Sequence, residues 1–181
     1  GIRENWSSKT RNDMSEVDWK AHIKRREELS KQIQEDAEFI ASEAAIKAQE
    51  QWENARPADD SHPYLLAKNV QPYGIRIEGE NLLIPIFNLA EKSITSLQTI
   101  SPNGEKRFLS GGKVQGGFYE ITNKDAPKDQ LILCEGFVTG ASIFEATGIS
   151  TVVCFNAGNL PIVAKTIRAN FPVLKLIIAA D

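Results

Sequence analysis

Two carboxylates near the end of the chain have positions suited to binding a divalent metal ion. The apolar residues 131–134 run into Glu135-Gly136, and the apolar residues 174–180 run into Asp181. A short, continuous apolar run that ends at turn residues is typical of a parallel strand that helices cover on both faces. Each acid then follows the carboxyl end of a strand, which is the edge where open α/β sheets bind ligands. Because Mg²⁺ and Mn²⁺ prefer oxygen ligands, the pattern predicts a site for one of these ions at Glu135 and Asp181.

The residues between the two acids predict a βαβαβ unit. Residues 141–146 favour a helix, and residues 151–155 form a second apolar, β-branched run. A turn at 156–159 precedes a helical pattern over 162–171, and a third apolar run follows. Right-handed crossovers would bring the ends of all three strands to one edge of a parallel sheet. Taken singly, each acid also has an ordinary alternative role as a helix cap or a solvated loop residue.

At these positions the chain resembles the Toprim domain, a metal-dependent catalytic module of bacterial-type primases, topoisomerases and some nucleases. The matching residues are Glu135 with Gly136, the turn from Asn156 to Asn159, and Asp181. In that family a glutamate ends the first strand and an Asp-x-Asp motif ends the third, so Asp181 matches the first aspartate of the motif. The second aspartate would lie two residues beyond the last residue of this chain. The resemblance therefore implies an incomplete metal site, and we expect the chain as given to be inactive or nearly so.

A small sheet is predicted ahead of the Toprim-like unit. The apolar runs at 81–88 and 94–100 are typical of strands, and they are followed by Asn103-Gly104. An Asn-Gly pair favours the positive φ values of a tight hairpin turn. We therefore expect the run at 94–100 to pair with a short strand near 107–109.

The order of segments around this hairpin resembles the catalytic core of bacterial replicative primases, above all the primases that phages, plasmids and mobile elements carry. A basic, aromatic and polar segment of that core matches residues 106–110, and the stretch that follows it matches Lys113 with Phe118-Tyr119. The resemblance implies that basic side chains contact the template or a nucleotide without reading base sequence. For any single basic residue, the rim of a solvated hairpin is an equally ordinary position. The residues assigned to nucleic acid or nucleotide are Lys106, Arg107 and Lys113 of this core, and Asn156 and Asn159 of the Toprim-like turn.

The resemblance implies a DNA primase, an enzyme that makes short RNA primers on single-stranded DNA during replication. Its substrates would be ribonucleoside triphosphates and a single-stranded DNA template, and a replicative helicase or a helicase domain of the same chain would be a further partner. Glu135 and Asp181 would hold Mg²⁺ or Mn²⁺ for nucleotidyl transfer. Two other classes stay open. A Toprim nuclease or topoisomerase would cut or relax DNA with the same acids, and a non-catalytic nucleic-acid-binding module would tolerate the loss of Glu135.

The first third of the chain favours helix. Residues 15–55 contain no glycine or proline, and their apolar residues recur at helical intervals among many charges. Asp13 or Ser15 is suited to cap this helix, and its narrow apolar stripe suits packing along the core or bundling with another segment. Binding to a partner is the alternative. The expected segments are a polar tail at 1–14, a helical segment at 15–56, an α+β subdomain at 57–128 and a partial Toprim domain at 129–181.

The composition is that of an ordinary globular protein whose surface is not strongly basic overall. The 181 residues are 41% hydrophobic and 25% charged, with a formal net charge of -3, so any contact with nucleic acid must be a local patch. Cys134, Cys154, His22 and His62 lack the paired spacing of zinc ligands. No signal peptide or apolar membrane span is evident. We expect a cytoplasmic protein without zinc and without membrane contact.

Overall fold

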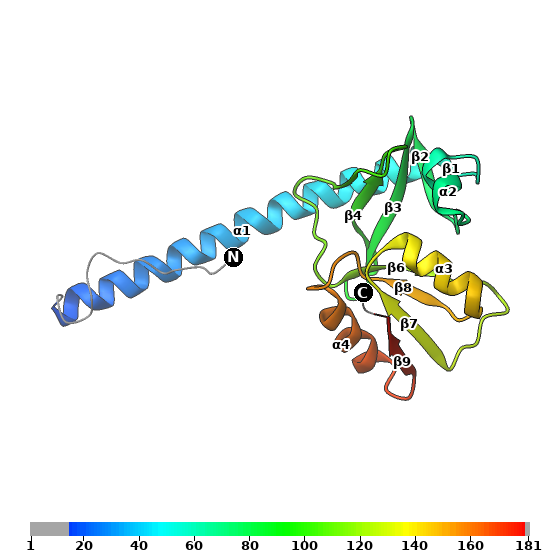
Figure 1. Cartoon of the computed structure of the whole chain (residues 1–181). Coiled ribbons are helices and arrows are strands. Elements are labelled where there is room, and N and C mark those ends of the chain that lie inside the picture. The colour runs from blue at the N-terminus through cyan, green and yellow to red at the C-terminus, as the bar shows by residue number, and fades with distance from the viewer. Residues whose placement is uncertain (1–14, 180–181) are drawn as a thin grey trace. The chain divides into compact units, whose positions relative to one another are not determined.

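The computed structural model describes residues 15–179 (Figure 1). The chain divides into two compact units between Phe39 and Ile40. Helix α1 (Glu16–Asn54) begins in the first unit and ends in the second. Its amino terminus is capped by Ser15, whose hydroxyl oxygen accepts a hydrogen bond of 3.2 Å from the N–H of Asp18. The prediction of a long helix with Ser15 as a cap is confirmed. The other candidate cap, Asp13, lies outside the described residues.

Helix α1 exposes most of its apolar side chains. Val17, Leu29 and Ile33 are each more than half exposed, and only Ala44 and Ala48 of this helix are buried. The two buried alanines belong to the second unit. Packing against a core is therefore found only in the last part of the helix, because isolated apolar residues among charges do not form a continuous stripe upstream. No helix within residues 15–179 is long and apolar enough to cross a membrane.

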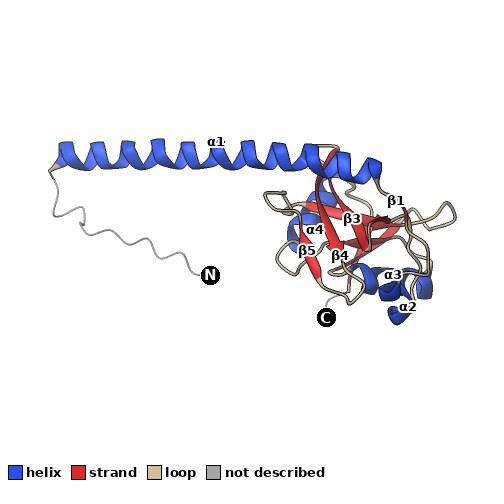
Figure 2. Ribbon diagram, turned by 90° about the horizontal axis from the view of Figure 1, so that it is seen from above, coloured by secondary structure: helices blue, strands red, loops and turns tan. Residues whose placement is uncertain are grey.

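The second unit is built on one mixed sheet (Figure 2). Its neighbouring strands follow the order β1-β2-β3-β6-β8-β7-β9, and β4 pairs with β3 and β5. Strand β7 runs parallel to β8 and β9, whereas the other pairs are antiparallel. The expected α/β class, with a small sheet and a parallel βαβαβ unit, is confirmed. The strands are β1 (Arg56–Pro57), β2 (Arg76–Glu78), β3 (Asn81–Asn88), β4 (Ser93–Ile100), β5 (Lys106–Phe108), β6 (Gly117–Ile121), β7 (Gln130–Cys134), β8 (Thr151–Val153) and β9 (Lys175–Ile178), and the helices after α1 are α2 (Pro63–Lys68), α3 (Phe137–Thr147) and α4 (Leu160–Asn170).

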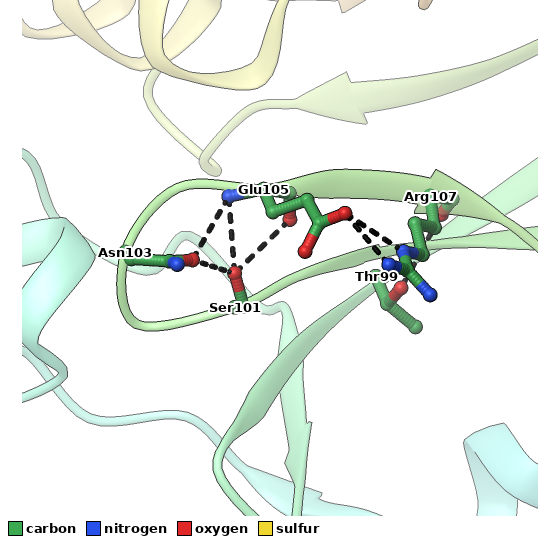
Figure 3. A network of polar contacts seen from close by, with 5 residues as sticks. All are labelled: Thr99, Ser101, Asn103, Glu105 and Arg107. Atoms are coloured by element: carbon green, nitrogen blue, oxygen red, sulfur yellow. Dashed lines mark hydrogen bonds and ion pairs between the residues drawn. The ribbon is translucent and has the colours of Figure 1, made fainter.

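Strands β4 and β5 form the predicted hairpin. Gln98 lies opposite Phe108, and the connecting turn contains Gly104 with a φ of +88°. Figure 3 shows how side chains hold this turn: the N–H of Glu105 donates to Oγ of Ser101 at 3.0 Å and to Oδ1 of Asn103 at 3.3 Å. The turn fixes the direction in which β5 returns along the sheet.

Neighbouring residues of β7 and β8 pack on opposite faces of the sheet. Leu133 and Val152 share a core cluster with Val163 of α4, whereas Cys134 and Val153 belong to the larger cluster that includes α3. Since side chains alternate between the two faces of a strand, a strand that is covered on both faces needs apolar residues at every position. This double cover explains the continuous apolar runs of β7 and β8. Strand β9, at the end of the strand order, has a similar run but is not buried on both faces, since Ile178 is 54% exposed.

Strand β6 joins the small sheet to the βαβαβ unit. It pairs with β3 through Phe118 and Phe87, and with β8 through Tyr119 and Val153. The sequence did not predict this strand, because its first residue is Gly117. A Cβ atom at Gly117 would lie 2.4 Å from a methyl carbon of Ile86, so only glycine allows this close approach.

Candidate functional site

Glu135 lies between the end of β7 and the start of α3. Its carbonyl oxygen accepts a hydrogen bond of 2.7 Å from the N–H of Phe155, the second residue after β8, so the ends of these two parallel strands are side by side. The side chain is partly exposed, and its carboxylate has no hydrogen bond or ion pair with any residue from 15 to 179. A carboxylate in this position is available to an external ligand such as a metal ion.

The turn after β8 places Asn156 at the same edge of the sheet. Phe155 adopts a φ of +71°, a left-handed conformation that bulky side chains rarely occupy. Asn156 is exposed, and its Oδ1 accepts a hydrogen bond of 2.9 Å from the N–H of Asn159 at the start of α4. This bond satisfies one of the free N–H groups at the helix terminus. One oxygen-bearing side chain therefore follows each of the two neighbouring strands.

The third strand of the unit also ends at this edge. Ile178 of β9 lies opposite Leu133 of β7, and the N–H of Ala179 donates a hydrogen bond of 2.8 Å to the carbonyl of Leu133. Asp181, the second predicted metal ligand, lies outside the described residues. The described residues contain no group of three or more His, Cys, Asp or Glu side chains that would hold a metal ion, and Glu135 is the single predicted metal ligand among them.

Strand β5 directs two side chains toward this edge. Lys106 and Phe108 are two residues apart and so lie on the same face of the strand. A Cβ atom at Gly136 would lie 3.9 Å from Nζ of Lys106, which places this ammonium group beside the turn that carries Glu135. The ring of Phe108 packs against the ring of Phe155 with centroids 6.1 Å apart and an interplanar angle of 79°. The hairpin therefore reaches the ends of β7 and β8.

The other two predicted basic residues already have acidic partners. Arg107, which alternates with Lys106 and Phe108, forms an ion pair of 2.8 Å with Glu105, as Figure 3 shows. Lys113 pairs with Glu91 in the loop between β3 and β4. Both pairs are substantially exposed, so they stabilise the fold little and can exchange partners. The structure brings Lys106 to the strand ends and leaves Arg107 and Lys113 in other surroundings.

Asn159 holds the loop before β6 against the end of β8. The residue is buried, and its Oδ1 accepts a hydrogen bond of 2.7 Å from the N–H of Gly116. Its Nδ2 donates to the carbonyls of Gly117 and Cys154, each at 2.8 Å, and of Val114 at 3.3 Å. Because backbone groups engage both Oδ1 and Nδ2 of this amide, its geometry suits a positioning role. No local pattern in the sequence indicates that this asparagine is buried.

The three tyrosines of the chain all have raised pKa values. The hydroxyl of Tyr119 donates a hydrogen bond of 2.5 Å to the carbonyl of Tyr73, and burial raises the pKa of Tyr119 to about 12. Burial and the Glu145 carboxylate, which accepts a hydrogen bond of 3.1 Å from the Tyr73 hydroxyl, raise the pKa of Tyr73 to about 12. Burial also raises the pKa of Tyr64. None of the three therefore has the lowered pKa that is one of the ways to activate a nucleophilic hydroxyl.

A cavity of about 690 Å³ lies on the sheet face near the end of α4. Its lining is mainly apolar and includes Phe87, Phe118, Ile167 and Phe171. None of the described candidate residues lines this cavity. The candidate site is therefore the surface at the carboxyl ends of β7 and β8. Sequence reasoning assigned no role there to Phe108 or Phe155; the alternation of Lys106 with Phe108 along one strand was the available signal.

Comparisons with known proteins point to primases. No family model matches the chain. It is 35% identical over 184 residues to an Escherichia coli protein named DNA primase TraC, a match that covers 92% of this chain and 13% of that protein. A second Escherichia coli protein of the same name is 32% identical over 162 residues, covering 87% of this chain and 14% of the relative. The chain thus spans 13% to 14% of the length of these curated relatives.

Among solved structures, the chain resembles one from a complex of bacteriophage T7 lagging-strand DNA polymerase with primase domains bound to an RNA/DNA hybrid and dTTP. The TM-score is 0.43 with 12% sequence identity, and the alignment covers 71% of this chain and 68% of that chain. By sequence, then, the chain is similar along most of its length to a short part of proteins named DNA primase.

Proposed function

We propose that this chain works in template-directed RNA primer synthesis on single-stranded DNA, as part of a primase-type catalytic core with a Toprim fold. The observation that carries the proposal is the similarity to two proteins named DNA primase, over 92% and 87% of this chain. The position of Glu135 supports it, because parallel strands end at the edge of the sheet where this carboxylate lies. The proposed substrates are ribonucleoside triphosphates and a single-stranded DNA template. A replicative helicase, or a helicase domain of the same protein, would supply the single-stranded template.

Glu135 and Asp181 are the proposed ligands of Mg²⁺ or Mn²⁺. Glu135 fits a hard cation, because it offers a partly exposed carboxylate that no residue from 15 to 179 engages. Asp181 enters the proposal from the sequence alone. When bound, such an ion lowers the barrier to nucleotidyl transfer by activating the attacking hydroxyl and neutralising the triphosphate. The chain's own contribution is to hold its carboxylate at the meeting point of β7 and β8.

The other residues would bind and orient the substrates. Lys106 is the basic residue whose position best supports contact with a nucleotide or template, since its ammonium group lies beside Gly136. Arg107 and Lys113 would bind template phosphates only by exchanging their acidic partners, so we assign them weaker contacts. Asn156 offers an exposed amide at the same edge. Asn159 would act indirectly, by holding the loop before β6 in place.

Ribonucleotide incorporation on a single-stranded DNA template tests the proposed function. The whole natural protein, supplied with Mg²⁺ or Mn²⁺, should make short RNA primers that disappear when a chelator removes the metal or when the template is omitted. Cut or relaxed DNA in place of primers would instead indicate a Toprim nuclease or topoisomerase. Template binding with neither activity would indicate a binding module.

A further inference from the structure

Phe108 and Phe155 form an aromatic pair at the edge that carries Glu135. Their rings meet edge to face, with centroids 6.1 Å apart, and they come from β5 and from the end of β8. Phe108 remains 42% exposed and Phe155 is partly exposed. Exposed aromatic rings beside a basic side chain are the usual platform on which proteins stack unpaired nucleobases.

The backbone of Phe155 gives a second reason to assign a role to this pair. The φ of Phe155 is +71°, which is unfavourable for a side chain of this size. Two backbone hydrogen bonds hold this residue in place. The N–H of Phe155 donates to the carbonyl of Glu135 at 2.7 Å, and the N–H of Cys154 donates to the carbonyl of Cys134 at 2.8 Å. Backbone strain of this kind concentrates at functional sites. Glycine would satisfy the backbone better, so the ring itself accounts for the phenylalanine: one part of it packs against the larger core cluster, and the part that stays exposed is available to a ligand.

Lys106 supplies the charge that a nucleotide requires. It shares a face of β5 with Phe108, and its Nζ lies beside the Gly136 turn. No ion pair to Lys106 is formed by residues 15–179, whereas its neighbour Arg107 is paired with Glu105. An unpaired ammonium group next to an aromatic pair matches the two chemical parts of a nucleotide, namely its phosphate and its base.

We propose that Lys106, Phe108 and Phe155 form a nucleotide clamp in which the phenylalanine pair stacks a base and the lysine binds a phosphate. The bound unit is either a free ribonucleoside triphosphate or one nucleotide of a single strand, and the two share this chemistry. The clamp rests on the proposed function, because it places the base and phosphate beside the proposed metal ligand Glu135. It adds the two aromatic residues, to which the resemblance to primases assigned no role.

Equilibrium binding by variants of the whole natural protein tests the clamp. The probes are ATP and a fluorescent oligothymidylate, each measured at several salt concentrations. The variants are Phe108→Leu, Phe155→Leu and Lys106→Gln, with Phe155→Gly as a second variant that removes the ring while favouring the left-handed backbone. The matched controls are Phe171→Leu, an exposed aromatic residue that lines the cavity near the end of α4, and Lys165→Gln at an exposed position of α4.

The clamp predicts that each phenylalanine variant weakens binding of one probe by about fivefold or more without changing the salt dependence. Lys106→Gln should weaken the same probe, and for the oligothymidylate it should reduce the slope of log affinity against log salt by about 0.7. The affected probe identifies the source of the nucleotide: loss for ATP assigns a substrate site, and loss for the oligothymidylate assigns a template site. The controls should bind both probes as the unmodified protein does.

Binding of both probes within twofold of the unmodified protein by all four variants would overturn the clamp. That result, combined with primer synthesis that depends on Glu135, would refute the clamp and leave the proposed function intact. Weakened oligothymidylate binding without any primer synthesis would instead keep the clamp and refute the primase activity. Thermal unfolding of each variant shows whether the fold is retained, and Phe155→Gly separates loss of the ring from strain in the backbone.

Discussion

The N–H of Gly116 donates a hydrogen bond of 2.7 Å to Oδ1 of Asn159, a residue 43 positions further along the chain. This contact ties the loop that leads into β6 to the turn that follows β8. Nδ2 of the same side chain donates to the carbonyls of Gly117 and Cys154. A single side chain therefore connects the start of β6 to the end of β8. Loss of this side chain would leave several backbone groups without partners in a buried place.

Replacement of Asn159 by alanine should therefore destabilise the fold. Because buried backbone groups lose their hydrogen bonds, we expect the free energy of unfolding to fall by about 2–4 kcal/mol. Urea denaturation followed by circular dichroism measures this change. Asn170→Ala is the matched control: Asn170 is exposed and makes one hydrogen bond to Thr166, so its loss should cost less than about 1 kcal/mol. Equal effects of the two substitutions would show that Asn159 does not hold the loop.

The backbone of Phe155 should favour glycine over alanine. Both substitutions remove the ring that contacts Phe108, but only glycine occupies a φ of +71° without a steric penalty. Phe155→Gly should therefore be about 1 kcal/mol more stable than Phe155→Ala, since the left-handed conformation costs other residues roughly 1–2 kcal/mol. Thermal or urea unfolding of the two variants side by side gives this difference. A more stable alanine variant would contradict the left-handed assignment.

Tyr119 should make the fold sensitive to alkaline pH. Burial raises the pKa of its hydroxyl to about 12, above the ordinary value of 10.0, so the folded state binds this proton more tightly than the unfolded state does. The resulting stabilisation is complete below about pH 10 and is lost as the pH rises toward 12, with a size of roughly 1–2 kcal/mol because the side chain is partly exposed. Unfolding free energies at pH values from about 9 to 11 test this linkage.

The Tyr119→Phe variant isolates this contribution from those of Tyr64 and Tyr73, whose pKa values are also raised. It removes the titrating group and keeps the ring that contacts Phe137. The variant should lose less stability between pH 9 and 11 than the unmodified protein does. Parallel curves for the two proteins would exclude Tyr119 as a source of the alkaline sensitivity.

Local patterns in the sequence predicted much of the second unit. Strands covered on both faces required continuous apolar runs, and Asn103-Gly104 fixed the β4-β5 hairpin. Helix α3 was predicted to start four residues too late, because Gly140 resembled a break in the helix. A Cβ atom there would lie 2.9 Å from a methyl carbon of Val153, so the glycine lets α3 pack closely on β8. This requirement arises from tertiary packing and leaves no local signal.

The candidate site was less predictable than the fold. Sequence order suggested that Glu135 and Asn156 follow neighbouring strands, and the parallel pairing of β7 and β8 provides this arrangement. Lys106 lies beside the Gly136 turn, whereas Arg107 pairs with Glu105. Which of the two reaches the strand ends depends on the face that β5 turns toward them, and the register of the hairpin sets that face. The burial of Asn159 depends on a loop 43 residues away. Contacts between distant segments were thus beyond the reach of local patterns.

Primer synthesis by the Glu135→Gln variant tests the central claim most directly. Glutamine keeps the size of the side chain but removes the charge that a divalent cation needs, so primer synthesis by the whole natural protein should fall by about 100-fold or more. Glu78→Gln, at the exposed end of β2, should leave synthesis unchanged. Primers from the unmodified protein and from Glu78→Gln, but not from Glu135→Gln, would support a metal-dependent primase with Glu135 at its centre. Undiminished synthesis by Glu135→Gln would contradict that assignment.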